Sequence, residues 1–219
     1  VEEELSTRWP ETRIEPSLDR IAELMSILGD PQHAYPVVHV AGTNGKTSVT
    51  RMVDSLLRAL HQRTGRTSSP HRQSVTERVA VDGEPVPARL FVDTYRELQP
   101  YLEMVDDRSQ ARGGPRMSYF EVLTAIAFVA FADAPVEVAV VETGMGGTWD
   151  ATNVVRPAVA VVTPVGLDHL DYLGEDLADI AAEKAGIIQP APSDDLLPRD
   201  PVAVFGRQEP EAMEVLLRR

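Results

Sequence analysis

The sequence contains no cysteine, which excludes both disulfide bonds and metal sites built on thiolate ligands. It has no apolar run long enough to cross a membrane, and no signal peptide opens it, so we expect a cytoplasmic protein. A net charge of -13 leaves no excess of positive charge for nonspecific binding to nucleic acid. We therefore expect neither nucleic acid nor a membrane as a partner.

Lysine is scarce as well. Of the 21 basic residues, only Lys46 and Lys184 are lysines, and all the others are arginines. Lys46 lies in a glycine-rich stretch, where a compact ammonium group fits a tight phosphate site better than a planar guanidinium does. We expect that Lys184 is also a lysine because arginine cannot replace it chemically. The alternative is that this lysine was kept by chance.

Residues 37–48 have the layout of a phosphate-binding loop. Val37–Val40 is typical of a buried strand, Gly42 and Gly45 open a loop, and apolar residues recur with helical spacing from Val49 onward. Backbone N–H groups of such a loop cradle phosphate oxygens, and the helix N-terminus adds positive potential. The residues expected to bind the nucleotide are Gly42, Thr43, Asn44, Gly45, Lys46, Thr47 and Ser48.

Within that loop we expect Lys46 to reach the outer phosphates of the ligand and a hydroxyl of Thr47 or Ser48 to ligate Mg²⁺. The strict motif has glycine where Val40 stands, so the loop is a variant. The alternative interpretation is an ordinary glycine turn before a helix.

Strand and helix patterns alternate along the chain, which predicts an α/β fold with a mostly parallel sheet flanked by helices. The expected strands are residues 37–40, a hairpin over 79–86, 136–141, 158–163 and 202–206. The expected helices are residues 18–28, 49–60, 87–106 with a break near Pro100, 118–131, 175–188 and 210–217. Residues 1–16, 66–72, 107–116 and 190–201 are expected to be irregular.

Acidic residues follow two of these strands. Glu142 ends one strand and precedes a glycine-rich stretch, and Asp168 and His169 follow the next. Ligands of open α/β sheets bind at the carboxyl ends of the strands, so we favour Mg²⁺ coordination by Glu142 over a solvated carboxylate. Ser118 and Glu121 form a capping-box pattern, with a ligand-facing Glu121 as the alternative.

These motifs occur in the order of a known family. The chain resembles the N-terminal ATPase part of folylpolyglutamate synthase/dihydrofolate synthase, within the Mur ligase superfamily. The segments that carry the resemblance are residues 41–48, 69–71, 77–78, 120–121, 142–147, 150–153, 168–169 and 183–186.

The resemblance implies a P-loop NTPase-like Mur ligase central domain, incomplete here: residues 1–219 would be a truncated N-terminal ATP-binding domain without the C-terminal ligase domain. It implies that ATP converts a carboxylate of dihydropteroate or folate to an acyl phosphate, which the amine of glutamate attacks. This chain alone would then be inactive as a ligase, and a separate chain is one possible source of the missing domain.

The resemblance also assigns roles to residues. Lys46, Glu142, His169 and Lys184 would be catalytic, and Ser48, Ser69, Glu142 and His169 would bind Mg²⁺. Lys184 matches a lysine that the family carbamylates, which arginine cannot replace.

The chain departs from the family pattern at Thr148, Arg72 and residues 66–68. These departures motivate two other hypotheses: a ligase domain for a different carboxylic acid, and a non-catalytic nucleotide-binding paralogue that acts as a partner subunit.

Overall fold

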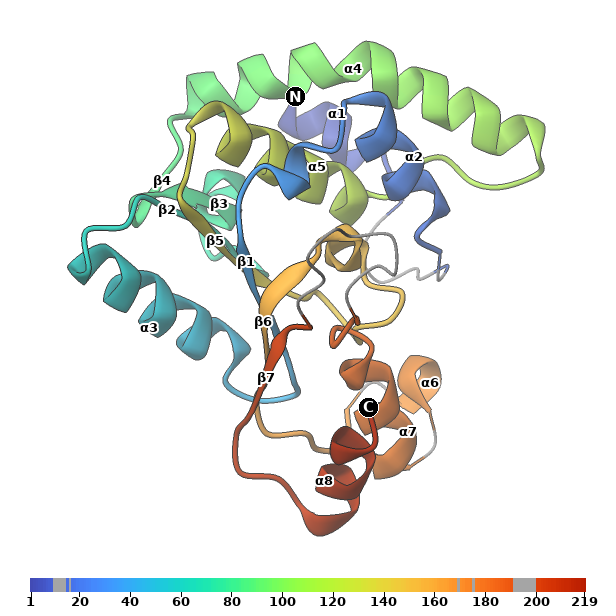
Figure 1. Ribbon diagram of the computed structural model, residues 1–219. Helices are drawn as coiled ribbons and strands as arrows, with labels where there is room; N and C mark the ends of the chain where they lie inside the picture. The colour runs from blue at the N-terminus through green and yellow to red at the C-terminus, as the bar shows by residue number, and fades with distance from the viewer. Residues whose placement is uncertain (10–14, 16, 169, 175, 191–199) are drawn as a thin grey trace.

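The computed structural model describes residues 1–9, 15, 17–168, 170–174, 176–190 and 200–219 (Figure 1). Within these residues one sheet has seven strands in the order β4-β3-β2-β5-β1-β6-β7. The strands are β1 (Val37–Ala41), β2 (Thr64–Thr67), β3 (Val79–Val81), β4 (Glu84–Pro85), β5 (Val138–Glu142), β6 (Pro157–Val162) and β7 (Val202–Phe205). The five strands from β2 to β7 in this order are parallel, and β3 and β4 form the predicted hairpin. The predicted fold class is confirmed.

Helices cover both faces of the sheet (Figure 1). The α-helices are α1 (Glu2–Ser6), α2 (Asp19–Ile27), α3 (Lys46–Ala59), α4 (Ala88–Ala111), α5 (Tyr119–Asp133), α6 (Leu170–Leu173), α7 (Leu177–Ala185) and α8 (Pro210–Leu217). The short 3₁₀ helices are η1 (Pro31–His33), η2 (Val75–Arg78) and η3 (Ala151–Val154). Helix α3 packs on β1, β2 and β5 from one side, while α5, α7 and α8 lie on the other. Helices α2 and α4 contact the outer side of α5.

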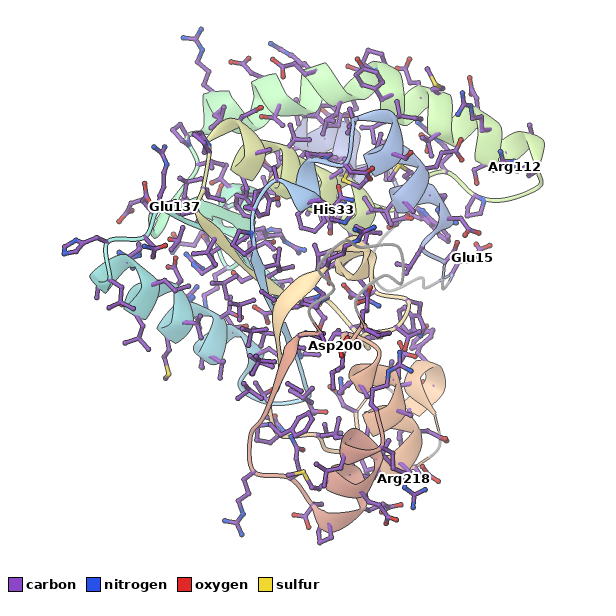
Figure 2. The ribbon with its side chains drawn as sticks, in the orientation of Figure 1. Glu15, His33, Arg112, Glu137, Asp200 and Arg218 are labelled. Atoms are coloured by element: carbon purple, nitrogen blue, oxygen red, sulfur yellow. The ribbon has the colours of Figure 1, made fainter. Side chains whose placement is uncertain are left out.

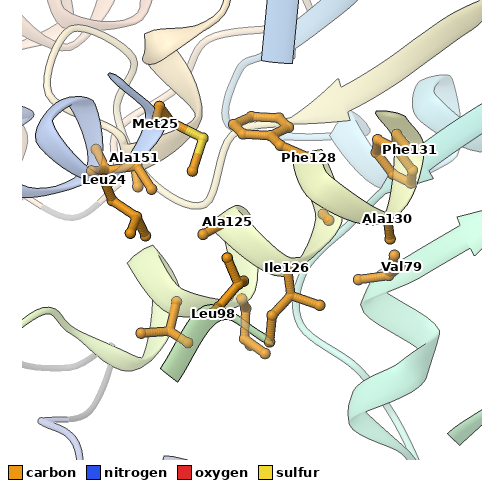
Figure 3. Close-up of a cluster of buried hydrophobic side chains, with 14 of the residues drawn as sticks. Leu24, Met25, Val79, Leu98, Ala125, Ile126, Phe128, Ala130, Phe131 and Ala151 are labelled. Atoms are coloured by element: carbon orange, nitrogen blue, oxygen red, sulfur yellow. The ribbon is translucent and has the colours of Figure 1, made fainter. Parts of the chain in front are cut away.

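Helix α5 is the centre of the larger core (Figure 3). Its side chains are apolar on nearly all sides, and a helix of that kind must be buried all round. Phe128 and Phe131 are fully buried, and Met25 and Leu98 reach the helix from α2 and α4. The core therefore fixes the first turn of α5, which reaches the edge of the sheet where the strands end.

Two sequence predictions about helices are wrong. Helix α4 passes through Pro100 without a break and ends only at Ala111, inside the segment expected to be a loop. Its buried residues continue from Leu98 to Leu102 and Val105, so tertiary packing on both sides of the proline holds the helix together. In addition, α1 forms inside the segment expected to be irregular, with Leu5 buried in the core.

Strand β2 was missed, because residues 64–67 contain no large apolar side chain. The strand is nevertheless buried, since its polar groups find partners inside the protein. The Thr64 hydroxyl donates to Asp54 Oδ1 at 2.6 Å, and Arg66 forms an ion pair with Asp54 at 3.4 Å. Part of the predicted 66–72 loop is therefore a strand.

Gly65 lets β2 approach α5. A Cβ atom at this position would lie 2.7 Å from the Phe131 ring. We expect Gly65→Ala to lower the free energy of unfolding by about 1–3 kcal/mol, because the buried ring must move. Urea denaturation measures this, with Gly166→Ala as the control, since a Cβ there meets only ordinary contacts at 3.9 Å. Equal stabilities of the two variants would contradict the close approach.

Candidate functional site

A cavity of about 530 Å³ lies at the carboxyl ends of β1 and β5. Its wall is formed by Trp9, Glu15, Ser17, Arg20, Thr43, Gly45, Lys46, Thr47, Ser48, Ser69, Pro70, Ser118, Phe120, Glu121, Glu142, Gly144, Met145, Trp149, Asp150 and Ala151. Glu15 belongs to the N-terminal segment and lies below α2 in Figure 2. Glu137, which precedes β5, lies on the opposite side of the molecule in the same view. The cavity is thus shared between the glycine loop, the first turn of α5 and the N-terminal segment.

The glycine loop has the predicted strand–loop–helix form. Gly45 adopts a φ of 85° immediately before α3 begins at Lys46. Gly42 has a φ of 140°, and a Cβ there would lie 1.9 Å from Thr163 Oγ1, so both glycines are required by the backbone. The N–H groups of Thr43 and Asn44 donate to the Pro164 carbonyl at 3.1 and 3.2 Å, which anchors the loop to the end of β6.

These contacts divide the predicted loop residues into two groups. Thr43 and Gly45 to Ser48 line the cavity, whereas Gly42 and Asn44 do not. The first-turn N–H groups of α3 lack partners within the helix, which makes this end of the helix a site for an anion. Lys46 Nζ lies at the same place and donates to the Gly42 carbonyl at 2.9 Å.

Glu142 is buried at the end of β5, with an exposed fraction of 2%. Its Oε1 atom accepts a hydrogen bond of 2.7 Å from the Thr47 hydroxyl. Its Oε2 atom is buried and has no hydrogen-bond partner in the described part of the chain. Burial raises the pKa of Glu142, and the Thr47 hydroxyl, the charge of Lys46, the nearby Ser69 backbone N–H and the charge of Arg51 oppose that rise.

This arrangement fits Mg²⁺. A buried carboxylate oxygen without a partner is a hard ligand that a divalent cation can satisfy, and Ser48 and Ser69 bring hydroxyl groups to the same cavity. Among the residues that the structure describes there is no cluster of three carboxylates or histidines, but Mg²⁺ keeps several waters and needs few protein ligands. The predicted ligand His169 lies outside the described residues.

Lys184 lies behind the glycine loop rather than in the cavity wall. It is buried on α7, and its Nζ atom donates to the Gly42 carbonyl at 3.1 Å, so both lysines of the chain meet at one carbonyl oxygen. Burial first, and then the charge of Lys46, lower the pKa of Lys184 to about 8. A large fraction of this amine is therefore neutral near pH 8.

Glu183, the neighbour of Lys184, holds the glycine-rich loop after β5. Its Oε1 atom accepts from the N–H groups of Gly147 and Trp149 at 3.2 and 3.3 Å. The Glu183 carbonyl accepts from both the N–H and the hydroxyl of Thr148, at 3.0 and 3.1 Å. The loop and α7 therefore form one unit, and the Thr148 hydroxyl has a structural contact.

A series of buried hydrogen bonds also holds the glycine-rich loop after β5. Asp150 accepts from the Thr152 N–H and hydroxyl and from the Met145 N–H, at 2.9, 2.5 and 2.8 Å. Since the Thr152 hydroxyl donates to Asp150, the His39 Nε2 atom, 2.8 Å away, donates to Thr152. Burial lowers the pKa of His39 to about 3, which keeps the ring neutral in this role.

The first turn of α5 has the predicted capping box. The Ser118 hydroxyl accepts from the Glu121 N–H at 3.1 Å, and Glu121 Oε2 accepts from the Ser118 N–H at 2.7 Å. Glu121 also forms an ion pair with Arg20 of α2 at 3.1 Å, and both residues line the cavity. Sequence reasoning did not single out Arg20, although a charged residue in phase with the buried Leu24 is a signal that could have found it.

The phosphate-binding loop before α3, together with a carboxylate at the end of the neighbouring parallel strand, defines an α/β nucleotide-binding domain. Residues 103–216 match the family described as Mur ligase middle domain. The chain belongs to the Mur ligase family.

Within that family it is similar to folate enzymes. It is 62% identical over 220 residues to the dihydrofolate synthase/folylpolyglutamate synthase of Mycobacterium tuberculosis, covering 99% of this chain and 45% of that protein. The structure superposes on Mycobacterium tuberculosis folylpolyglutamate synthase complexed with ADP with a TM-score of 0.91 and 61% identity, covering 99% of this chain and 46% of that one. An FPGS–AMPPCP–folate complex matches with a TM-score of 0.86 and 33% identity, covering 99% and 50%. The chain spans about half the length of these relatives, and the predicted resemblance is confirmed.

None of the helices in the described part of the chain has both the length and the apolar character needed to span a bilayer.

Proposed function

We propose that this chain carries the ATP-dependent, carboxylate-activating part of a folylpolyglutamate/dihydrofolate synthase. The observation that carries the proposal is that Lys46, at the start of α3, and Glu142 line one cavity, and that the buried Oε2 atom of Glu142 has no hydrogen-bond partner among the described residues. Two solved relatives are complexes with ADP and with AMPPCP, which supports ATP as the nucleotide.

In this proposal the loop residues Thr43 and Gly45 to Ser48 hold the phosphates, and Lys46 neutralises the outer ones. Glu142, Ser48 and Ser69 would hold Mg²⁺, with His169 as a further ligand implied by the family. Mg²⁺ supplies charge neutralisation and orientation when it is bound. Lys46 turns from the Gly42 carbonyl to the phosphates, so that positioning and charge, rather than covalent chemistry of the protein, lower the barrier.

The carboxylate to be activated would enter the same cavity. Its wall also contains the aromatic residues Trp9, Phe120 and Trp149, which suit a planar substrate such as dihydropteroate or folate. The substrate carboxylate would attack the terminal phosphate of ATP, releasing ADP and leaving an acyl phosphate. The amine of glutamate would then displace phosphate and form the amide.

Lys184 would act as its carbamate. The neutral amine adds CO₂ and loses one proton, which gives a carbamate anion next to the Gly42 carbonyl. The lowered pKa of the amine supports this reaction, because it keeps much of Lys184 neutral near pH 8. An anion there would attract Mg²⁺ that a lysine ammonium repels.

We further propose that residues 1–219 are the N-terminal ATP-binding domain of such a ligase, and that a second domain, on the same chain or on another, completes the glutamate site. The support is that the chain spans about half the length of its relatives. Ligation by these residues alone is therefore expected to be weak or absent.

Calorimetric titration of ATP tests the nucleotide site. We expect binding that requires Mg²⁺ and that Lys46→Ala weakens by about 10-fold or more, since a charge-assisted contact is lost. Arg89→Ala is the control, because it also removes one positive charge but from a side chain that is 93% exposed on α4. An affinity for ATP that depends neither on Mg²⁺ nor on the Lys46 side chain would overturn the proposal. ADP release that depends on added dihydropteroate would support the named substrate over other acids.

A further inference from the structure

The described residues of the N-terminal segment (residues 1–9, 15 and 17–20) contribute Trp9, Glu15, Ser17 and Arg20 to the cavity wall. Two polar contacts join these residues to the first turn of α5. The Tyr119 N–H donates to the Trp9 carbonyl at 3.3 Å, and Arg20 pairs with Glu121. Trp9, Arg20 and Glu121 all line the cavity, so these contacts shape its wall.

Arg20 is held in one orientation. Its Nε atom donates to both oxygens of Glu121, at 3.1 and 3.3 Å, and its guanidinium lies 5.5 Å from the centre of the Trp9 ring. Glu121 is held in turn by the Ser118 N–H at 2.7 Å. The exposed fractions of the two paired side chains are only 9% and 5%. Arg20, Trp9 and the first turn of α5 therefore form one connected unit.

A buried ion pair of this kind contributes little net stability, because removing two charges from water offsets most of their attraction. What it does provide is a fixed geometry between the two elements that it joins. Here it joins α2 to the first turn of α5, and the part of the cavity wall fixed in this way is Trp9 and that first turn, which carries Phe120, rather than the phosphate-binding loop.

We propose that Arg20 is a positioning residue for the carboxylate substrate. Through Glu121 and Trp9 it holds the wall that receives the planar, aromatic part of that substrate, and it takes no part in nucleotide binding. The inference rests on the proposed function, in which this cavity accepts an aromatic carboxylate.

The test compares two substitutions of buried arginines. Arg20→Met breaks the pair at the cavity, whereas Arg66→Met breaks the pair with Asp54, which also joins side chains with exposed fractions of 9% and 3% but lies on the α3 side of the sheet and outside the cavity wall. Tryptophan fluorescence follows dihydropteroate binding, because Trp9 and Trp149 both line the cavity. Calorimetry measures the binding of ATP with Mg²⁺.

We expect Arg20→Met to weaken dihydropteroate binding by about 10-fold to 100-fold, as a displaced positioning group does, and to leave the Kd for ATP within about 2-fold. Arg66→Met should change neither constant by more than that. The double variant Arg20→Met with Glu121→Gln removes both charges, so it should recover stability without recovering dihydropteroate binding.

Three outcomes overturn the inference. If the wild type binds dihydropteroate and Arg20→Met binds it equally well, the inference is wrong but the proposed function stands. A wild type that binds ATP but not dihydropteroate overturns the inference together with the proposed substrate. Equal weakening of ATP and dihydropteroate binding by Arg20→Met would indicate a merely structural role and would also reject it.

Discussion

Replacing Glu142 with glutamine is expected to abolish the Mg²⁺ dependence of ATP binding and to lower dihydropteroate-dependent ADP release by about 10²–10³-fold. Glu142 supplies a buried carboxylate oxygen that has no partner among the described residues. Glutamine has nearly the same shape and can still accept from the Thr47 hydroxyl, but it lacks the charge that holds a divalent cation. Calorimetric titrations of ATP with Mg²⁺ and with EDTA measure the first effect.

The same substitution is expected to stabilise the protein. Burial raises the pKa of Glu142 in the folded state above its ordinary value of 4.5, so the folded protein holds this proton more tightly than the unfolded chain does. Ionising the carboxyl therefore costs stability, and the cost grows as the pH rises from that ordinary value through the raised pKa. Glu142→Gln removes this cost, so its unfolding temperature at pH 7 should exceed that of the wild type, and the difference should vanish below about pH 4.

Glu137→Gln is the matched control for both effects. Glu137 lies just before the same strand, β5, at the end away from the cavity, where its carboxylate accepts from the Arg63 N–H at 2.7 Å (Figure 2). Its substitution should leave Mg²⁺-dependent ATP binding unchanged. Normal Mg²⁺ dependence in Glu142→Gln would remove this residue from the proposed metal site.

The site was partly predictable because strand ends and glycine loops leave local marks in a sequence. Gly42 and Gly45 stand where the backbone adopts positive φ, and Glu142 stands where a parallel strand ends, so the residue pattern alone is enough to place them. The capping box of Ser118 and Glu121 is equally local and is confirmed.

Other features depend on contacts between segments that are distant in the sequence, so no local residue pattern predicts them. Strand β2 forms because Asp54 and Phe131 provide partners for a short polar and glycine-containing stretch. Pro100 is tolerated because buried residues on both sides hold α4. The pairing of Arg20 with Glu121 joins residues 101 positions apart, which residue periodicity within one helix cannot reveal.

The structure also changes the interpretation of two departures from the family pattern. Arg66 pairs with Asp54 on the α3 side of the sheet and is not part of the cavity wall, so it does not bear on the substrate pocket. Thr148 is anchored to the Glu183 carbonyl and supports the loop that carries Trp149. Neither residue gives independent support to a different acid or to a non-catalytic paralogue.

Replacing Lys184 with arginine is expected to lower dihydropteroate-dependent ADP release by about 10²-fold or more, while ATP binding changes far less. Arginine keeps a positive charge and cannot form a carbamate, so the anion proposed beside the Gly42 carbonyl is lost. If the proposal is correct, ¹³C NMR in the presence of labelled bicarbonate near pH 8 shows a carbamate signal in the wild type and in Lys46→Ala, but none in Lys184→Arg.

The pH range of this experiment follows from the contacts of Lys184. Its pKa in the folded state is about 8, below the ordinary value of 10.5, because the amine is buried and lies near Lys46. The folded state therefore disfavours the proton, so the stability of the wild type should rise between about pH 8 and pH 10.5, where the folded protein has lost the proton and the unfolded chain still binds it. Carbamate formation should fall steeply below pH 8, since protonated amine does not add CO₂.

Lys184→Ala separates a chemical role from a packing role. It removes the amine without introducing a larger group, and its loss of activity should be partly restored by a short carboxylate such as propionate, which supplies an anion in the space left behind. A variant that is equally inactive with and without propionate, in a protein whose wild type shows no carbamate signal, would contradict the proposed modification. The Gly42 carbonyl would then remain the partner of two ammonium groups, and the survival of Lys184 in a chain so poor in lysine would need a reason in packing.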